Sequence, residues 1–376
     1  MDSASLEENA DTLVLVTGAT GLVGSHCVKQ LLDAGYGVRG TVRNLLNKKK
    51  NGPVRDLDRT GLGRLELVEA KLTDEQSWKP AVKGCTFVLH VASPVAVKSQ
   101  PNEKEVGKLV DVGTLNVLRA VEAEPLVKRL VYCGSIAAVM TGNLDASKRH
   151  FGEEDWSTLE GCRPYDKLKH LAEKAAWDFV SSLKEKGRAV DMVAILPSPI
   201  AGPPIVHCSG SGIVEMFGQM LSGWMPLPRV PLLLVDVRDV AGAHVLAMRA
   251  ERAGGRRIIL NTDGADDADA NDMACLLRRE FGPQGYKLWT WPPPRWLMRV
   301  FGWLSPHFAG VHRLVDQRIT LSCNERRELL AMTEMIDWKT AVLSMAYTII
   351  EQGVVPKTDA YKGMDPTLRP YALSVS

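Results

Sequence analysis

Residues Thr12–Gly24 read T-L-V-L-V-T-G-A-T-G-L-V-G and decide the fold of this chain. The apolar, β-branched run Leu13–Val16 predicts a strand, and Gly18, Gly21 and Gly24 predict a tight turn that leads into a helix of regular apolar spacing. Glycines at this spacing allow a sharp turn, a close approach of the backbone to a phosphate, and tight packing of helix on strand. We therefore interpret the stretch as a dinucleotide-binding unit rather than as an ordinary turn rich in small residues.

The same alternation of strand and helix continues over the first half of the chain. Apolar runs predict further strands at Tyr36–Arg43, Arg64–Val68, Thr86–Ala92, Arg129–Cys133 and Val190–Leu196. Helical spacing lies between them, at about 103–121 and from Pro164 onward. Strands that alternate with helices indicate parallel βαβ units, so the expected fold class is α/β, with a doubly wound parallel sheet of the Rossmann type.

The alternation becomes irregular after Pro203, which predicts a second, smaller part. We expect a flexible lead at 1–11, a dinucleotide-binding domain with the catalytic residues at 12–203, a mainly substrate-binding part at 204–364, and a tail at 365–376. A strand at about 232–235 and a helix at about 240–250 are expected to return to the first domain. Further helices are predicted at about 213–221 and 338–352, and a further strand at about 256–261. The long polar loop 137–164 suggests a functional or lid segment.

Composition limits the possible partners. The chain has 376 residues, with 46 Lys and Arg against 44 Asp and Glu, so its formal net charge of +2 favours neither nucleic acid nor an anionic membrane. Seven scattered cysteines, without metal-ligand spacing, predict reduced and buried thiols rather than a metal site. The acidic first residues lack a signal-peptide pattern, and no apolar run has membrane-spanning length, so a cytoplasmic protein is expected, either monomer or homodimer.

The segment that follows the second predicted strand is basic. Arg43 ends that strand, Lys48–Lys50 follow, and no carboxylate is present there to bond the ribose 2′-hydroxyl, as it does in NAD sites. A guanidinium group suits a 2′-phosphate, and nearby lysines add positive potential, although a solvated basic loop is the alternative for the lysines. The sequence thus predicts NADPH rather than NADH.

A tyrosine and a lysine mark the candidate reaction centre. Tyr165 and Lys169 are four residues apart at the start of a predicted helix, so they share one face. An adjacent ammonium favours the phenolate and brings the phenol pKa toward neutral pH, which suits proton transfer to a carbonyl oxygen. Ser135 follows the fifth strand, where ligand groups gather in such sheets; its hydroxyl either holds the substrate oxygen or bonds its own turn.

With these residues the chain resembles the extended short-chain dehydrogenase/reductases of the NAD-dependent epimerase/dehydratase family, and within them the branch of dihydroflavonol, cinnamoyl-CoA and aldehyde/ketone reductases. The matching segments, in family order over about two thirds of the chain, are Thr17–His26, Tyr36–Arg43, Lys83–Pro94, Gly113–Leu118, Arg129–Val139, Tyr165–Trp177, Leu196–Pro203 and Val235–His244.

The resemblance implies roles for individual residues. Tyr165 would be the acid–base, Lys169 would tune it and hold the nicotinamide ribose, and Ser135 would orient the carbonyl. The implied cofactor contacts are Gly18, Thr20, Gly21, Leu22, Val23, Arg43, Lys50, Leu72, Ala92, Tyr165, Lys169 and Pro197. Simple packing is the alternative for Ala92 and Pro197.

The chain also departs from the family pattern. Lys71 stands where relatives usually carry an aspartate beside the adenine, and Gly134 stands where a serine or threonine is common. His26, His90 and His244 lie in apolar runs and are interpreted as core histidines rather than ligands. No flavonoid or coenzyme A signature is present, so the substrate is left open.

Residues 289–303 read W-T-W-P-P-P-R-W-L-M-R-V-F-G-W and hold four of the nine tryptophans. Three interpretations compete: a packed wall of the C-terminal part, an aromatic lining for an apolar substrate, and contact with a membrane surface. The packed wall is favoured, because burial is the commonest use of large aromatic residues.

We therefore expect an NADPH-dependent oxidoreductase that reduces a fairly apolar aldehyde or ketone, with Tyr165 as proton donor. A 3β-hydroxysteroid dehydrogenase type of reaction and a sugar-nucleotide epimerase are alternatives within the enzymes. A non-catalytic regulator that senses dinucleotides is the alternative from another class, and the presence of Tyr165 and Lys169 argues against it.

Overall fold

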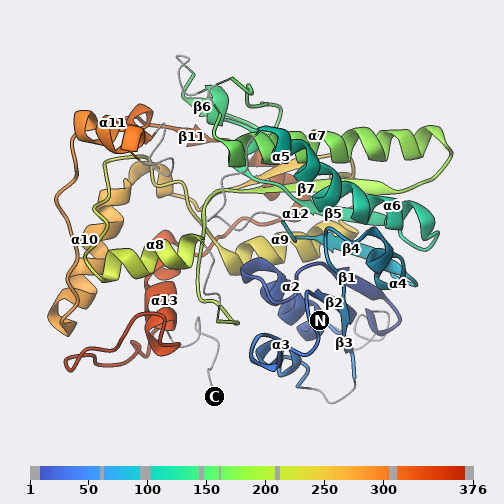
Figure 1. Cartoon of the computed structure of the whole chain (residues 1–376), viewed down its shortest axis with the longest axis horizontal. Helices are drawn as coiled ribbons and strands as arrows, with labels where there is room; N and C mark the ends of the chain where they lie inside the picture. Colours follow the sequence, from blue (N-terminus) through green and yellow to red (C-terminus); the bar gives the residue numbers. More distant parts are fainter. Residues whose placement is uncertain are drawn as a thin grey trace.

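The computed structural model describes residues 9–59, 63–93, 103–143, 148–160, 162–207, 212–304 and 311–368. A seven-stranded parallel sheet, in the order β3-β2-β1-β4-β5-β7-β10, forms the centre of the molecule (Figure 1). Its strands are β1 (Leu13–Val16), β2 (Gly37–Val42), β3 (Leu65–Glu69), β4 (Phe87–His90), β5 (Arg129–Cys133), β7 (Asp191–Pro197) and β10 (Arg257–Leu260). The strand order reverses direction between β1 and β4, and a crevice at the carboxyl ends of the strands is expected at such a point.

Helices cover both faces of this sheet, as the buried central strands require. One face carries α2 (Leu22–Asp33), α3 (Lys48–Arg55), α9 (Val237–Arg249) and α12 (Asn324–Leu330). The other face carries α4 (Trp78–Val82), α5 (Glu103–Val110), α6 (Asn116–Ala123) and α7 (Pro164–Glu185). The α/β, doubly wound Rossmann fold predicted from the sequence is confirmed.

A second apolar core lies beside the sheet (left in Figure 1). It is built by α8 (Gly212–Leu221), α10 (Ala270–Phe281) and α13 (Trp338–Glu351), and α11 (Arg295–Leu304) lies at its upper end in this view. Asp337 caps α13 by accepting hydrogen bonds from the backbone N–H groups of Lys339 and Thr340. Helix α9 packs against α2, and β10 pairs with β7, so part of the C-terminal half returns to the main sheet.

Short elements complete the chain. The 3₁₀ turns are η1 (Glu75–Ser77), η3 (Ile136–Ala138), η4 (Thr141–Asn143), η5 (Glu251–Ala253), η6 (Ala265–Asp267), η7 (Gly282–Gln284) and η9 (Val311–Arg313), and η2 (Asp111–Leu115) is a π-helical turn. Two small parallel pairs join β8 (Ile200–Ala201) to β9 (Val235–Asp236) and β6 (His150–Phe151) to β11 (Thr320–Leu321).

The secondary structure corrects the sequence analysis at three places. The helix expected at about 103–121 is interrupted by η2, where the carbonyl of Gly113 accepts a hydrogen bond from His90. The strand expected at 232–235 shrinks to Val235–Asp236, because Leu232 N–H bonds to the carbonyl of Ala268 and Leu234 N–H to the side chain of Asn261. Strand β8 lies within residues 197–203, whose three prolines and one glycine predict that any regular element stops there.

The predicted flexible ends lie largely outside the described part of the chain. Residues 1–8 and 369–376 are not among the described residues.

The basic segment Lys48–Lys50, for which a solvated loop was the alternative, forms a helical turn at the start of α3.

Candidate functional site

The glycine turn after β1 has the geometry of a phosphate cradle. Gly18 has a φ of 68°, in the left-handed region that favours glycine, and its carbonyl accepts a hydrogen bond from the N–H of Gly21. A Cβ on Gly24 would lie 2.2 Å from that same carbonyl oxygen, and one on Gly21 would lie 3.2 Å from it. Gly24 in particular must therefore be a glycine for this turn to fold against the start of α2.

Helix α2 begins directly at this turn, and no side chain caps its N-terminus. Gly21 is the N-cap, with extended backbone and without a side-chain hydrogen bond, and the first turn contains no acidic residue. The backbone N–H groups of Leu22 and Val23 thus point their partial positive charge at the space above Gly18. Thr20 and Leu22 lie in this same turn, so the predicted pyrophosphate residues are brought together.

Strand β2 holds the cradle from one side. The hydroxyl of Thr41 accepts a hydrogen bond from Gly18 N–H at 3.0 Å, and the carbonyl of Thr41 accepts one from Ala19 N–H. A Cβ on Gly40 would lie 2.7 Å from the Cβ of Ala19, so glycine is needed there as well. Gly40 was not singled out from the sequence, although its place inside a predicted strand was a signal of close backbone approach.

Strand β4 holds the cradle from the other side, at the point where the strand order reverses. The buried hydroxyl of Thr17 accepts a hydrogen bond from Ala92 N–H and lies 3.0 Å from Nδ1 of His90, whose Nε2 lies 3.1 Å from the carbonyl of Gly113. Since the carbonyl requires a proton on Nε2, Nδ1 accepts from Thr17. Burial and the charge of Lys169 lower the pKa of His90 to about 4, so this ring is neutral.

The three core histidines are thereby accounted for. His26 lies 2.8 Å from the carbonyl of Pro203, and His244 lies 2.7 Å from that of Val240. Burial lowers the pKa of each to about 4. Both rings are neutral packing groups, as the sequence interpretation expected.

The predicted contacts for the adenosine half lie at the ends of β2 and β3. Arg43 is exposed directly after β2, and Lys50 is exposed in α3, where its N–H is bonded by the side chain of Asn47. Leu72 follows β3, and its carbonyl accepts a hydrogen bond from Asn116. Arg39, by contrast, pairs with Glu66 on the neighbouring strand.

Lys71, the departure from the family pattern, forms an ion pair with Glu69. The Nζ atom of Lys71 lies 3.2 Å from the carboxylate, whose other oxygen accepts from Leu45 N–H in the loop after β2. Both contacts lower the pKa of Glu69, and the hydrogen bond from Leu45 N–H has a larger effect than the contact with Lys71. The lysine thus neutralises a carboxylate that reaches the loop beside Arg43.

Lys169 is buried at the carboxyl end of β5. Its Nζ donates to the carbonyls of Cys133 at 3.3 Å and Gly134 at 3.5 Å. Lys169 and Ala92 line the same small cavity of about 10 Å³, which is too small for a substrate. Burial alone would lower the pKa of Lys169, but Tyr165 and the groups around it raise it overall, so the ammonium form is favoured.

Tyr165 lies one helical turn before Lys169, in the first turn of α7, and is half-buried. The bidentate pair of Arg163 with the fully buried Asp166 fixes this turn, with distances of 2.8 and 3.1 Å. The other phenol near Lys169 is that of Tyr132, which is fully buried in β5, and burial raises its pKa to about 12. Tyr165 is therefore the more exposed of these two phenols near Lys169.

Ser135 follows β5 and starts η3. Its hydroxyl oxygen accepts a hydrogen bond from Ala137 N–H at 3.2 Å, which is the turn contact considered as the alternative for this residue. The hydroxyl proton is not used in that bond. A Cβ on the preceding Gly134 would lie 2.5 Å from Cδ2 of Leu196, so a larger residue there requires the Leu196 side chain to shift.

Pro197 ends β7 and is buried next to β10, with which it pairs in register. Each predicted site residue other than Lys169 thus follows or ends a strand of the sheet or lies in the first turn of α2, α3 or α7, and Lys169 lies in the second turn of α7. Because the carboxyl ends of parallel strands share one edge, all of them border the same edge of the sheet.

A buried ionic network under α7 was missed from the sequence. The carboxylate of Glu173, one turn beyond Lys169, bonds Nε of Arg257 on β10 at 2.7 Å. Desolvation raises the pKa of Glu173, while Arg257 opposes this shift. The guanidinium of Arg257 also donates to the carbonyls of Glu153 and Asp155. The spacing Tyr165, Lys169, Glu173 was the available signal, since all three share one helix face.

The same network ties down the long loop after β5. The ring of Trp156 lies between two cations, with Lys174 Nζ and the guanidinium carbon of Arg257 each 3.7 Å from its centroid. Strand β6 of this loop pairs with β11 from the C-terminal part. The described residues of this segment, interpreted as a functional or lid segment from the sequence, are thus anchored to the sheet and to the C-terminal part.

The packed wall expected from the tryptophan-rich stretch is wrong. Trp289, Trp291, Trp296 and Trp303 have exposed fractions of 48, 60, 68 and 87%, whereas Met298 is buried.

The cysteines depart in one place from the expectation of buried thiols, because Cys275 is exposed. The described cysteines are free, and Cys208 lies outside the described residues.

In the described part of the chain, no group of three or more His, Cys, Asp or Glu side chains is arranged to hold a metal ion. None of the described helices combines the length and the apolar character that crossing a bilayer requires.

Comparisons with known proteins agree with this geometry. The sequence profile of the NAD dependent epimerase/dehydratase family matches residues 14–261. Dihydroflavonol 4-reductase of Zea mays is 33% identical over 71% of this chain and 74% of its own length, and cinnamoyl-CoA reductase CAD2 of Medicago truncatula is 35% identical over 67% and 77%. The fold is similar to that of yeast methylglyoxal/isovaleraldehyde reductase Gre2, solved in complex with NADPH, with a TM-score of 0.74, 22% identity, and coverage of 91% of this chain and 99% of that one.

The fold and the site define an oxidoreductase of the extended short-chain dehydrogenase/reductase type. The chain belongs to the NAD dependent epimerase/dehydratase family, and its similarity to the plant reductases confirms the branch expected from its motifs.

Proposed function

We propose that this chain reduces an aldehyde or ketone to an alcohol, with NADPH as cofactor and Tyr165 as the proton donor. The observation that carries the proposal is the position of Lys169, buried beside Ala92 at the carboxyl end of β5 and one turn after Tyr165. This is the edge of the sheet at which the phosphate cradle of Gly18 also lies.

The residues of the cradle fit a dinucleotide. The missing Cβ of Gly24 lets the start of α2 pack against Gly18, and the uncapped start of α2 supplies N–H donors for a pyrophosphate. Arg43 would bind the 2′-phosphate, with Lys50 adding positive potential. Lys71 supports the preference for NADPH, because it forms an ion pair with Glu69 and so offsets a negative charge close to the loop that contains Arg43. When bound, NADPH supplies the hydride for the carbonyl carbon.

Each catalytic side chain then has a separate task. Lys169 stays charged in its buried position, holds the nicotinamide ribose, and favours transfer of the phenol proton from Tyr165 to the carbonyl oxygen. Ser135 uses its free hydroxyl proton to orient that oxygen and to stabilise the charge that develops on it. Ala92 and Pro197 would border the nicotinamide ring.

The substrate class is a small carbonyl compound. The similar proteins named above are reductases of dihydroflavonols, cinnamoyl-CoA, and methylglyoxal or isovaleraldehyde, which gives a first panel for screening. Fairly apolar compounds of medium size remain the expectation from the sequence, as does a cytoplasmic location.

Replacement of Tyr165 by phenylalanine tests the reaction. NADPH binding, followed by fluorescence, should stay within about twofold of wild type, while kcat/KM for the best carbonyl substrate should fall about 10²–10⁴-fold, the usual contribution of a general acid. Tyr361→Phe, which removes a hydroxyl bonded to Glu351 in the C-terminal part, is the matched control. Two results would favour the alternative of a non-catalytic regulator that senses dinucleotides. One is unchanged turnover in Tyr165→Phe, and the other is that wild type binds NADPH but turns over no substrate of the panel.

Replacement of Arg43 by alanine tests the cofactor choice. Loss of one charge-assisted contact with a phosphate should raise the Kd for NADPH about tenfold and leave that for NADH nearly unchanged. Lys83→Ala, a change of an exposed cation at the opposite end of the sheet, is the control. Equal weakening of both cofactors by Arg43→Ala would contradict the assignment.

A further inference from the structure

The tryptophans of α11 lie on the solvent side of that helix. Trp296, Val300 and Trp303 are spaced by four and three residues, so they form one stripe, and their exposed fractions are 68, 43 and 87%. Met298 on the opposite side is 1% exposed. A helix that buries one methionine and exposes two tryptophans has its largest apolar side chains on the solvent side.

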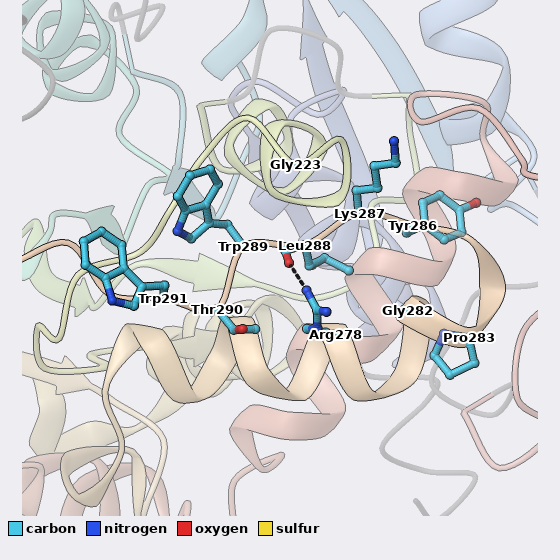
Figure 2. A pocket seen from close by; sticks show the side chains of 10 residues that line it. All are labelled: Gly223, Arg278, Gly282, Pro283, Tyr286, Lys287, Leu288, Trp289, Thr290 and Trp291. Carbon is cyan, nitrogen blue, oxygen red and sulfur yellow. Dashed lines mark hydrogen bonds between the residues drawn. The ribbon is translucent and has the colours of Figure 1, made fainter.

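The segment before α11 also exposes two tryptophans. Trp289 and Trp291 are 48 and 60% exposed and are two residues apart in non-helical chain, so they point to the same side, as Figure 2 shows. Pro292–Pro294 then lead directly into α11, and prolines restrict the backbone between the two tryptophan pairs.

The charge of this region is of one sign. No Asp or Glu occurs between Glu280 and Asp316, whereas Lys287, Arg295 and Arg299 all fall in this interval. Arg295 and Arg299 are exposed on α11, beside the tryptophan stripe. Exposed aromatic residues flanked by cations are the pattern of helices that lie in the interface of an anionic membrane.

A groove next to Trp289 and Trp291 contains Lys287 and adds one further cation, Arg278. It has a volume of about 730 Å³, and Arg278 and Lys287 line it together with these tryptophans (Figure 2). Arg278 donates to the carbonyl of Leu288, which holds its guanidinium at the groove. None of the predicted catalytic or cofactor residues lines this groove, so it is separate from the site described above.

We propose that α11 and the segment before it form a docking surface for anionic lipid bilayers. The tryptophan rings of residues 289, 291, 296 and 303 insert at the level of the headgroups, and Arg295 and Arg299 bind lipid phosphates. The groove with Arg278 and Lys287 accepts a headgroup. The protein then binds peripherally, through one face, without any membrane-spanning helix.

Cosedimentation of the full-length protein with vesicles tests this proposal. Vesicles of phosphatidylcholine alone are compared with vesicles that also contain phosphatidylserine. Wild type should pellet with the anionic vesicles and be released by salt. Replacement of Arg295 and Arg299 by glutamine should weaken binding about fivefold for each arginine, and Trp296→Ser with Trp303→Ser should weaken it at least about tenfold for each tryptophan.

Matched controls separate this surface from general stickiness. Leu126→Ser removes an apolar side chain that is 58% exposed and lies outside this region. Arg252→Gln removes an exposed cation that also lies outside it. Both variants should bind vesicles as wild type does. Circular dichroism and thermal unfolding confirm that all variants are folded.

Four results would overturn the proposal. The first is that wild type does not pellet with anionic vesicles, and the second is that it binds neutral vesicles equally well. The third is that the tryptophan and arginine variants bind vesicles as wild type does. The fourth is that the tryptophan substitutions dissociate a dimer instead of weakening vesicle binding. An increase of KM for a carbonyl substrate in those variants, with vesicle binding unchanged, would assign the tryptophans to the substrate site.

Discussion

Replacement of Gly24 by alanine tests the close contact on which the phosphate cradle depends. The added Cβ would lie 2.2 Å from the carbonyl oxygen of Gly18 and 2.9 Å from its carbonyl carbon. Both are backbone atoms, so no side-chain rotation relieves the contact. An ordinary contact begins at 3.4 Å, and the turn and the start of α2 must therefore move apart by about 1.2 Å.

The free energy of unfolding should fall as a result. Overpacking of this kind costs about 1–3 kcal/mol or more, and the higher helix propensity of alanine offsets about 1 kcal/mol of it. We expect a net loss of up to about 2 kcal/mol or more for Gly24→Ala, measured by urea unfolding followed by circular dichroism. The Kd for NADPH should rise at least about tenfold, because the N–H donors of α2 move away from the pyrophosphate position.

Gly107→Ala is the matched control for this prediction. Gly107 is an exposed glycine inside α5, and a Cβ there would meet nothing within 4 Å. The same substitution should therefore stabilise the protein by about 0.5–1 kcal/mol and leave NADPH binding unchanged. If Gly24→Ala unfolds at the urea concentration of wild type and binds NADPH equally well, the cradle does not depend on this contact.

Two further predictions concern stability. Gly134→Ser should lower the free energy of unfolding by about 1–3 kcal/mol, because its Cβ would lie 2.5 Å from Cδ2 of the buried Leu196. Urea unfolding should show that adding Leu196→Val restores part of this loss. A serine variant as stable as wild type would contradict this packing. The buried His26, His90 and His244 have pKa values lowered from 6.5 to about 4, so the unfolded chain takes up protons first as the pH falls. Each should therefore reduce the free energy of unfolding by up to about 3 kcal/mol between about pH 6.5 and 4, as measured by urea unfolding in a pH series, and a constant value across that window would show that they are not buried and neutral.

The sequence predicted the parts of the site that depend on local geometry. The glycine turn after β1 follows from backbone conformation, and the shared face of Tyr165 and Lys169 follows from helical spacing. The edge at which Ser135 and Pro197 lie follows from the parallel sheet, because all strands end there.

Contacts between distant segments could not be predicted in this way. Glu173 and Arg257 are 84 residues apart, and nothing local in either segment specifies their pairing. The backbone of Leu232–Leu234 bonds to a loop and to a side chain instead of a strand, which an apolar pattern does not reveal. The sequence of residues 289–303 does not show that Met298 rather than the tryptophans faces the interior.

The pairing of β6 with β11 determines how this enzyme can be re-engineered. His150 and Phe151 align with Thr320 and Leu321, and Arg149 donates to Gln317 in the same C-terminal segment. A chimera that imports the loop 137–163 from a relative would lose these partners unless residues 317–321 were exchanged with it. The loop 137–163 and this remote segment thus form one transplantable unit, although more than 150 residues separate them in the chain.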